Sequence, residues 1–198
     1  RLELALHQIK PHFLQNALMS IKVLCRTRPK EAEQAVYDFA VFLRGNMNAL
    51  ESAEMILFRE ECKTIERYLH IEKMRFGERL QVQWDLQEEK FQIPPLTIQP
   101  LVENAVCHGI CQKMEGGTVQ IRSFRKNGEI CVQILDDGAG FDTEKLKDAD
   151  GIAIRNLKLR LKEFLNADLE IESRKGEGCR QTIHIPWEET EDENYSDR

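Results

Sequence analysis

Apolar residues recur at three- and four-residue steps through roughly the first 76 residues of the chain. That spacing predicts helices, because it gathers the apolar side chains on one face. Pro29 separates the first helix from the second, and a Gly-Asn pair at 45–46 weakens the end of the second. The third helix is expected to include residues 56–57 and to end at Gly77. These helices are too few for a monomeric bundle, so we expect residues 1–78 to form a helical dimerisation region.

From about Leu80 the period changes to two, which is the period of half-buried strands. The alternating apolar positions are Val82, Trp84, Leu86, Val119, Ile121, Ile130, Val132, Ile134, Leu169, Ile171, Ile183 and Ile185. The pair at 127–128, Asn-Gly, predicts a hairpin, and helices are expected from about 96 to 110 and from 154 to 165. Strands interleaved with helices predict an α+β fold over residues 79–187, a sheet with helices on one face.

The composition is that of a globular chain, with 198 residues, 41% hydrophobic and 31% charged. A net charge of −6 argues against a nucleic-acid partner. No apolar run approaches the ~18 residues of a membrane-spanning helix, so we expect neither such a helix nor a signal peptide in this sequence. The chain opens at Arg1 already in helical pattern, so we expect a missing part upstream. Residues 188–198 are mostly acidic, which predicts a disordered tail.

Six cysteines stand at positions 25, 62, 107, 111, 131 and 179 without a regular framework, which favours reduced thiols in a cytosolic compartment. The closest set is Cys107-His108-x-x-Cys111, and no second ligand pair follows it at a spacing typical of zinc sites. We therefore interpret the cysteines as small buried apolar residues rather than as metal ligands.

The stretch "QIKPHFLQN" places His12 on one helix face with Asn16 and Gln8, each four residues away. An exposed, partly neutral imidazole can act as a nucleophile, and Asn16 can orient a water or a phosphoryl oxygen. An ordinary solvated histidine explains the same pattern. Pro11 costs a helix interior about 3 kcal/mol or more. We interpret it as shaping the presentation of His12 by freeing the carbonyl of His7.

Two further stretches combine polar side chains with helix or strand ends. In "PLVENAVCHG", His108 lies one helical turn after Asn104, whose amide oxygen suits Mg²⁺ held between phosphates. A buried amphipathic helix explains this stretch equally well. In "ILDDGAGF", Asp136 ends a strand before the Gly138-x-Gly140 turn, and such a carboxylate can accept a hydrogen bond from the amino group of a purine. A simple turn also uses Asp and Gly in this way.

The stretch "GIAIRN" opens the amphipathic helix near residue 154. A glycine before a helix, here Gly151, leaves backbone N–H groups free to bind phosphate. Asn156 and Arg160 follow, one turn apart. A permissive glycine at an ordinary helix start is the other interpretation of this stretch.

The order of these stretches carries a family resemblance. Residues 98–186 resemble the ATP-binding domain of the GHKL superfamily, a Bergerat-type α/β sandwich, with "GEGCRQTIHIP" as its closing glycine box and last strand. Three stretches, "QIKPHFLQNALMSI", "YLHIEKMRFGERL" and "PPLTIQPLVENAVCHG", are similar to sensor histidine kinases of the LytS/YehU type. The resemblance covers roughly residues 5–186 and implies an autophosphorylating kinase core.

The resemblance also implies roles for single residues and a set of partners. His12 would be the phosphoacceptor, assisted by Asn16, and Asn104 the Mg²⁺ ligand. The ATP contacts it implies are Asn104, His108, Asp136, Gly138, Gly140, Gly151, Asn156 and Arg160, with residues 141–150 as a lid. The implied partners are a second copy of the chain and a response-regulator receiver domain. The chain would be the cytoplasmic portion of a protein anchored in the bacterial inner membrane through an upstream sensor region.

One difference from the hydrolases of the superfamily and two departures from the family pattern bear on these roles. Pro100 stands where hydrolases of the superfamily carry a glutamate base, which favours transfer to a protein side chain over ATP hydrolysis. Ala153 replaces a usual glycine, and Cys179 stands where threonine is common. Two alternatives therefore stay open, a degenerate core that binds nucleotide or partners without turnover and an anti-sigma-type protein-serine kinase. The latter leaves His12 unexplained.

Overall fold

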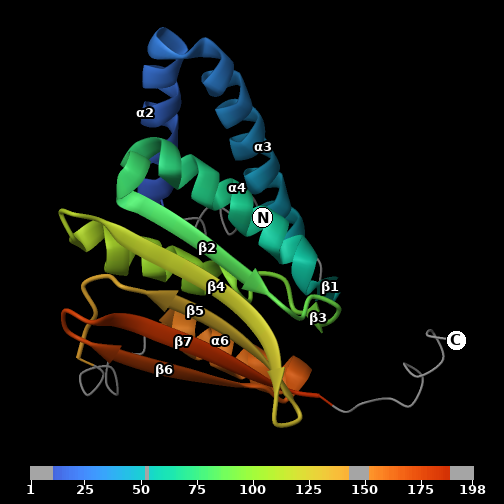
Figure 1. Cartoon of the computed structure of the whole chain (residues 1–198). Coiled ribbons are helices and arrows are strands. Elements are labelled where there is room, and N and C mark those ends of the chain that lie inside the picture. The colour runs from blue at the N-terminus through green and yellow to red at the C-terminus, as the bar shows by residue number, and fades with distance from the viewer. Residues whose placement is uncertain (1–10, 52–53, 143–151, 188–198) are drawn as a thin grey trace, which may run out of the picture.

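The computed structural model describes residues 11–51, 54–142 and 152–187, and Figure 1 shows a helical hairpin standing on a layered unit of sheet and helices. The helices are α2 (Pro11–Thr27), α3 (Pro29–Glu51), α4 (Phe58–Phe76), α5 (Gln99–Asn104) and α6 (Ile152–Leu165). The strands are β1 (Ile56–Leu57), β2 (Leu80–Leu86), β3 (Gln92–Ile93), β4 (Gly117–Lys126), β5 (Glu129–Asp136), β6 (Asp168–Arg174) and β7 (Gly178–Pro186).

An aromatic cluster joins the hairpin of α2 and α3 to α4. The ring of Phe13 lies 5.2 Å from that of Phe42 and 5.1 Å from that of Tyr68, measured between centroids. All three side chains are buried, and aromatic pairs at such distances contribute beyond their buried area. Helix α4 ends as expected, because the N–H of Gly77 donates to the carbonyl of Lys73.

Two expectations for the helical region were wrong. Helix α3 does not weaken at 45–46 but runs on to Glu51, because the buried Asn46 donates from Nδ2 to the carbonyl of Phe42 and packs inside the protein. Residues 56–57 are not helical but form β1, which pairs antiparallel with β3. That pairing joins residues about 36 positions apart, so the local helical period cannot reveal it.

The main sheet has the strand order β2-β4-β5-β7-β6, with β2 parallel to β4 and the other neighbours antiparallel. The predicted hairpin at 127–128 joins β4 to β5. Alternate residues of β5, including Val132 and Ile134, are buried against the helices, and α6 lies behind the sheet in Figure 1. The expected α+β layering, with helices on one face, is therefore what the structure shows.

One continuous apolar core runs from Phe13 of α2 to Ile185 of β7. Helix α4 contributes Ile65 and Leu69 to it, and α6 contributes Leu157 and Leu161, as the amphipathic pattern predicted. The division at 78/79 into a dimerisation region and a catalytic domain stays a prediction, since the core crosses that boundary. No helix in the described part of the chain is long and apolar enough to cross a membrane.

Several predictions fall on segments that the structure does not describe. Gly151 and most of the proposed lid lie outside the described residues, and so does the acidic tail. His7 and Gln8 precede the first described residue, so the proposed effect of Pro11 on the carbonyl of His7 stays a prediction.

Candidate nucleotide site

The segment expected to be a single helix from 96 to 110 is helical but changes geometry at its polar residues. Helix α5 ends at Asn104, a π-helical turn follows over Ala105–Gly109, and a 3₁₀ turn over Ile110–Gln112. His108 is exposed on the π-helical turn, and Asn104 is half-buried at the end of α5. Single π-helical turns inside helices are frequent at functional sites.

The loop after β5 is docked against that π-helical turn. The N–H of Gly138 donates to Oδ1 of Asp136 over 2.9 Å, and the N–H of Ala139 donates to the carbonyl of Gly109 over 3.1 Å. A Cβ on Gly138 would lie 2.3 Å from the backbone of Gly109, and a Cβ on Gly109 would lie 2.4 Å from Oδ1 of Asp136. Neither position can carry a side chain, so paired glycines bring Asp136 against the helix that bears His108.

The turn between β6 and β7 holds the other side of this loop. Gly140 has a φ of +57°, a conformation that glycine adopts readily, and a Cβ there would lie 2.0 Å from the carbonyl oxygen of Arg174. The N–H of Gly176 donates to the carbonyl of Ala139 over 2.7 Å. Cys179 of β7 is in register with Asp136. The loop over 136–140 is therefore fixed from both sides.

Asp136 has the electrostatic environment of a buried acceptor. Its side chain is 8% exposed. Burial raises the pKa of the Asp136 carboxyl to about 6, although the N–H of Gly138 opposes the shift. Above that pH the group is a carboxylate that can accept an N–H donor. An open hollow of about 580 Å³ at the β6–β7 turn includes Asp136 and Cys179 in its lining but neither Asn104 nor His108. It therefore does not by itself define the site.

A buried polar chain links the helical hairpin to α5. Oε1 of Glu61, in α4, accepts the N–H groups of Ile98 and Gln99 over 2.7 and 2.9 Å, which satisfies donors at the start of α5. Nε2 of Gln99 donates to Oδ1 of Asn46, in α3, over 2.9 Å and to Oε1 of Glu103 over 2.8 Å. The sequence analysis did not predict these buried hydrogen bonds. The pattern that could have indicated them is the presence of polar residues on apolar helix faces.

The two polar residues expected to contact ATP from α6, Arg160 and Asn156, lie in different surroundings. Arg160 donates from Nη2 to the carbonyl of Pro95, in the segment before α5. Desolvation lowers the pKa of its guanidinium, and the charge of Glu61 opposes that shift. Asn156 is exposed. The structure thus places Arg160 as a link between α6 and the entry to α5, and its contact with ATP stays a prediction.

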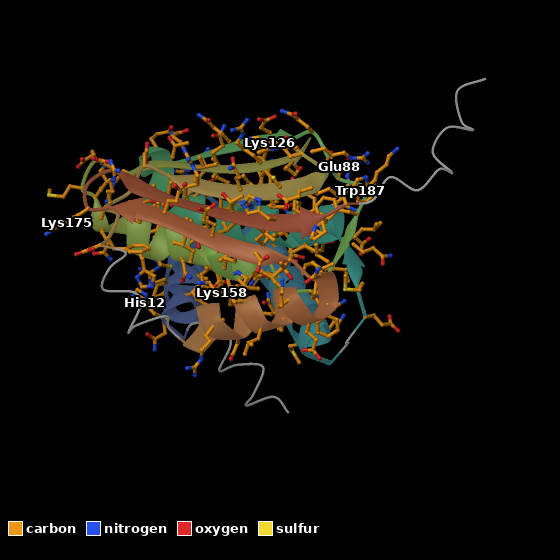
Figure 2. The ribbon with its side chains drawn as sticks, turned by 90° about the horizontal axis from the view of Figure 1, so that it is seen from below. His12, Glu88, Lys126, Lys158, Lys175 and Trp187 are labelled. Atoms are coloured by element: carbon orange, nitrogen blue, oxygen red, sulfur yellow. The ribbon has the colours of Figure 1, made fainter. Side chains whose placement is uncertain are left out.

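The proposed phosphoacceptor forms a second group, separate from this loop. His12 is exposed on α2, where Figure 2 labels it, and the amide nitrogen of Asn16 lies 3.1 and 3.2 Å from its two ring nitrogens. The expected His12–Asn16 face is therefore present. The structure gathers Asp136, Gly138 and Gly109 at the end of β5.

Comparisons with known proteins match the two parts of the chain that contain these groups. Residues 1–80 match the family model described as histidine kinase, and residues 95–189 match that of the histidine kinase-, DNA gyrase B- and HSP90-like ATPases. The uncharacterised protein YwpD of Bacillus subtilis is 36% identical over 200 residues, which covers 96% of this chain and 72% of YwpD.

The chain belongs to the histidine kinase family. The sensor histidine kinase BtsS of Escherichia coli is 34% identical over 91% of this kinase chain, and the sensor protein LytS of Bacillus cereus is 30% identical over 94%. The chain spans only 32% and 34% of their lengths. The histidine kinase domain of the blue-light activated kinase EL346 from Erythrobacter litoralis shares the fold, with a TM-score of 0.54 over 88% of this chain and 92% of that one, at 15% identity.

These findings confirm the resemblance to LytS-type sensor histidine kinases and the GHKL-type fold of the kinase core. ATP is the nucleotide that the family of the second domain implies. The residues around Asp136 fit this nucleotide. Gly109 and Gly138 approach each other too closely to carry side chains, so neither of them places a side chain beside the buried Asp136 carboxyl.

The buried Glu61 gives the kinase core a pH-dependent stability. Burial raises its pKa from 4.5 to about 7, against the N–H groups of Gln99 and Ile98. The folded chain therefore holds this proton more tightly than the unfolded chain does, and this contribution to the free energy of unfolding falls as pH rises from about 4.5 to 7. The loss is about 3 kcal/mol at about 1.4 kcal/mol per pH unit.

We expect Glu61→Gln to flatten this part of the pH profile and to unfold no more easily than wild type at pH 8. The amide oxygen can still accept both N–H groups, and no charge is buried. Urea unfolding between pH 4.5 and 8 measures the effect as the difference between wild type and variant. Glu60→Gln, an exposed neighbour on α4, is the matched control. Parallel profiles for wild type and Glu61→Gln would contradict the assignment.

Proposed function

We propose that this kinase core transfers the γ-phosphoryl group of ATP to His12 and then passes it to an aspartate of a response-regulator receiver domain. The observation that supports this best is the presence of both halves in one chain. An exposed His12–Asn16 pair lies on α2, and a glycine-lined loop at Asp136 is docked on the helix of Asn104 and His108. A serine kinase would need the second group and would leave the first without a role.

Each site residue has a distinct part in the proposed transfer. The Asp136 carboxylate accepts a hydrogen bond from the amino group of adenine, and Gly138 and Gly140 shape the pocket by letting the loop dock against Gly109 and Arg174. Asn104 would hold Mg²⁺, which neutralises phosphate charge when bound, and His108 lies one turn on for the phosphates. A ring nitrogen of His12 forms the bond to the γ-phosphorus as the bond to the β–γ bridging oxygen breaks, and ADP leaves.

Apolar side chains on the hairpin support the proposed homodimer. Leu18, Met19 and Val23 of α2 are 56%, 60% and 59% exposed, and Val36 and Tyr37 of α3 are 51% and 61% exposed. Large apolar residues gathered on neighbouring helices favour burial against another surface. A second copy of the hairpin would cover them, because two hairpins supply the four helices of a bundle.

The proposed setting of the core follows from its relatives. LytS and BtsS are sensor proteins about three times as long as this chain, which spans 34% and 32% of their lengths. We infer that the chain is the cytoplasmic part of a membrane-anchored sensor and that its stimulus is received upstream.

Incubation of the purified chain with γ-labelled ATP and Mg²⁺ tests the proposal. We expect one acid-labile, base-stable label per chain, found in the peptide that contains His12, and a dimer by light scattering. Acid-stable label on serine or threonine would instead support the serine kinase. ATP binding without any label would support the degenerate core and overturn the proposed transfer.

A further inference from the structure

Three metal-binding side chains meet on the outward face of the main sheet. Cys131 of β5 is in register with His184 of β7, and Glu129 stands two residues before Cys131 on the same face. Nδ1 of His184 lies 2.9 Å from Oε2 of Glu129 and 3.9 Å from Sγ of Cys131. All three atoms lie within 4.8 Å of one another. The pairing of β5 with β7 thus brings together three side chains whose spacing in the sequence does not predict a metal site.

The donor atoms suit a tetrahedral divalent metal. Zinc binds thiolate sulfur at about 2.3 Å and imidazole nitrogen or carboxylate oxygen at about 2.0–2.2 Å, which sets neighbouring ligand atoms roughly 3.3–3.6 Å apart. The measured separations of 2.9 and 3.9 Å bracket that range, so side-chain rotations without strand movement can meet it. The same ring nitrogen faces both partners, as one metal ion requires.

The second ring nitrogen of His184 faces a carboxylate, which is a common partner of metal-binding histidines. Nε2 of His184 lies 3.6 Å from Oε2 of Glu170, on β6. A carboxylate on the second ring nitrogen fixes the orientation and tautomer of such a histidine. Here Glu170 lies close enough to Nε2 to take this part while Nδ1 is turned toward Cys131 and Glu129.

The three side chains differ in exposure, which leaves a path from solvent by which a metal ion can enter. Cys131 is 3% exposed, whereas the side chains of His184 and Glu129 are 32% and 41% exposed. The sulfur lies at the floor, and the nitrogen and oxygen lie at a rim open to solvent. A water can therefore complete the coordination from outside, as at zinc sites with three protein ligands.

The cluster lies apart from the nucleotide loop. Cys131 precedes Asp136 by five residues of extended strand, which is roughly 17 Å at about 3.3 Å per residue. Figure 2 shows Lys126 and Trp187 at the cluster's end of the sheet and Lys175, in the β6–β7 turn, at the other end.

We propose that Glu129, Cys131 and His184 form a zinc site, oriented by Glu170, that clips β5 to β7 on the outward face of the sheet. Binding replaces the thiol proton, which passes to solvent, because the thiolate is the metal ligand. The site stabilises the pairing of β5 and β7, two interior strands of the catalytic sheet, and takes no part in phosphoryl transfer.

Cobalt and zinc binding to the full chain, purified without metal, tests the site. With Co²⁺ we expect one equivalent to give a thiolate-to-cobalt charge-transfer band, which Cys131→Ser abolishes. Glu170→Gln should keep the band but weaken Zn²⁺ affinity by about tenfold. Zn²⁺ should raise the melting temperature of wild type and not that of Cys131→Ser, since a ligand stabilises only the state it binds.

Cys111→Ser is the matched control, because it removes a half-buried thiol from the other cysteine–histidine grouping of the chain. It should keep the charge-transfer band. Loss of the band in Cys111→Ser with retention in Cys131→Ser would move the metal to the Cys107–Cys111 stretch and overturn the proposal. Absence of any band in folded wild type with excess Co²⁺ would also overturn it. Circular dichroism and ATP binding of each variant show that its fold is intact.

Discussion

His12→Ala is expected to abolish the phosphoryl label completely while leaving ATP affinity unchanged. The imidazole is exposed on α2 and contacts the amide of Asn16, whereas the glycine loop at Asp136 belongs to another part of the molecule. Removing the ring therefore removes the proposed acceptor without touching the nucleotide loop. Labelling with γ-labelled ATP, together with equilibrium binding of ATP, separates the two effects.

Two variants sharpen that result. His70→Gln removes an imidazole that pairs with Asp38 across α3 and α4, and it should leave labelling in place. Asn16→Ala should keep His12 as the acceptor but slow its labelling, because the amide that orients the ring is gone. Full labelling of His12→Ala would remove His12 from the mechanism, even if His70→Gln behaved as expected.

The parts of the fold that follow local patterns were predictable from the sequence. Alternation along β5 placed the buried Val132 and Ile134 on one face of the strand, and the Asn-Gly pair gave the hairpin. The period of α6 gave the face that carries Leu157 and Leu161. In each case the side chains that define the pattern lie within a few residues of one another, so a short window contains the whole signal.

What the sequence did not reveal depends on contacts between distant segments. The β1–β3 pairing is only two residues long and spans the whole of α4, whose helical period masks it. Asn46 stays in a helix because Gln99, 53 residues away, meets its side chain in the core. Helix propensity at Asn46 is outweighed by that burial and by its bond to Phe42, a tertiary effect beyond local reasoning.

The candidate site also has features that the sequence predicted and features that only the structure reveals. The order of the stretches around Asn104, Asp136 and Gly151 was enough to identify the family. The approach of Gly138 to Gly109, which decides how the loop sits, involves two glycines 29 residues apart and is visible only in three dimensions. Glu61, buried beneath α5, also escaped notice, because a glutamate in a helix is ordinarily exposed.

Asn104→Ala is expected to reduce Mg²⁺-ATP-dependent labelling by at least about a hundredfold, since metal and phosphate positioning supplies most of the catalysis in phosphoryl transfer. The dimer should remain intact. The anchors of α5 are the N–H groups of Ile98 and Gln99 on Glu61 and the side chain of Gln99 on Asn46, and the substitution touches none of them.

A metal-dependence measurement distinguishes loss of the Mg²⁺ ligand from general damage to the site. Chelation of Mg²⁺ should weaken ATP binding to wild type but cause little further weakening in Asn104→Ala, because the variant already lacks the amide that we propose as the metal ligand. Asn48→Ala, the same substitution at an exposed position of α3, should label normally and keep its response to Mg²⁺. If Asn104→Ala labelled fully, or lost affinity on chelation as wild type does, the end of α5 would not hold the metal, and the ligand would have to come from another residue around the Asp136 loop.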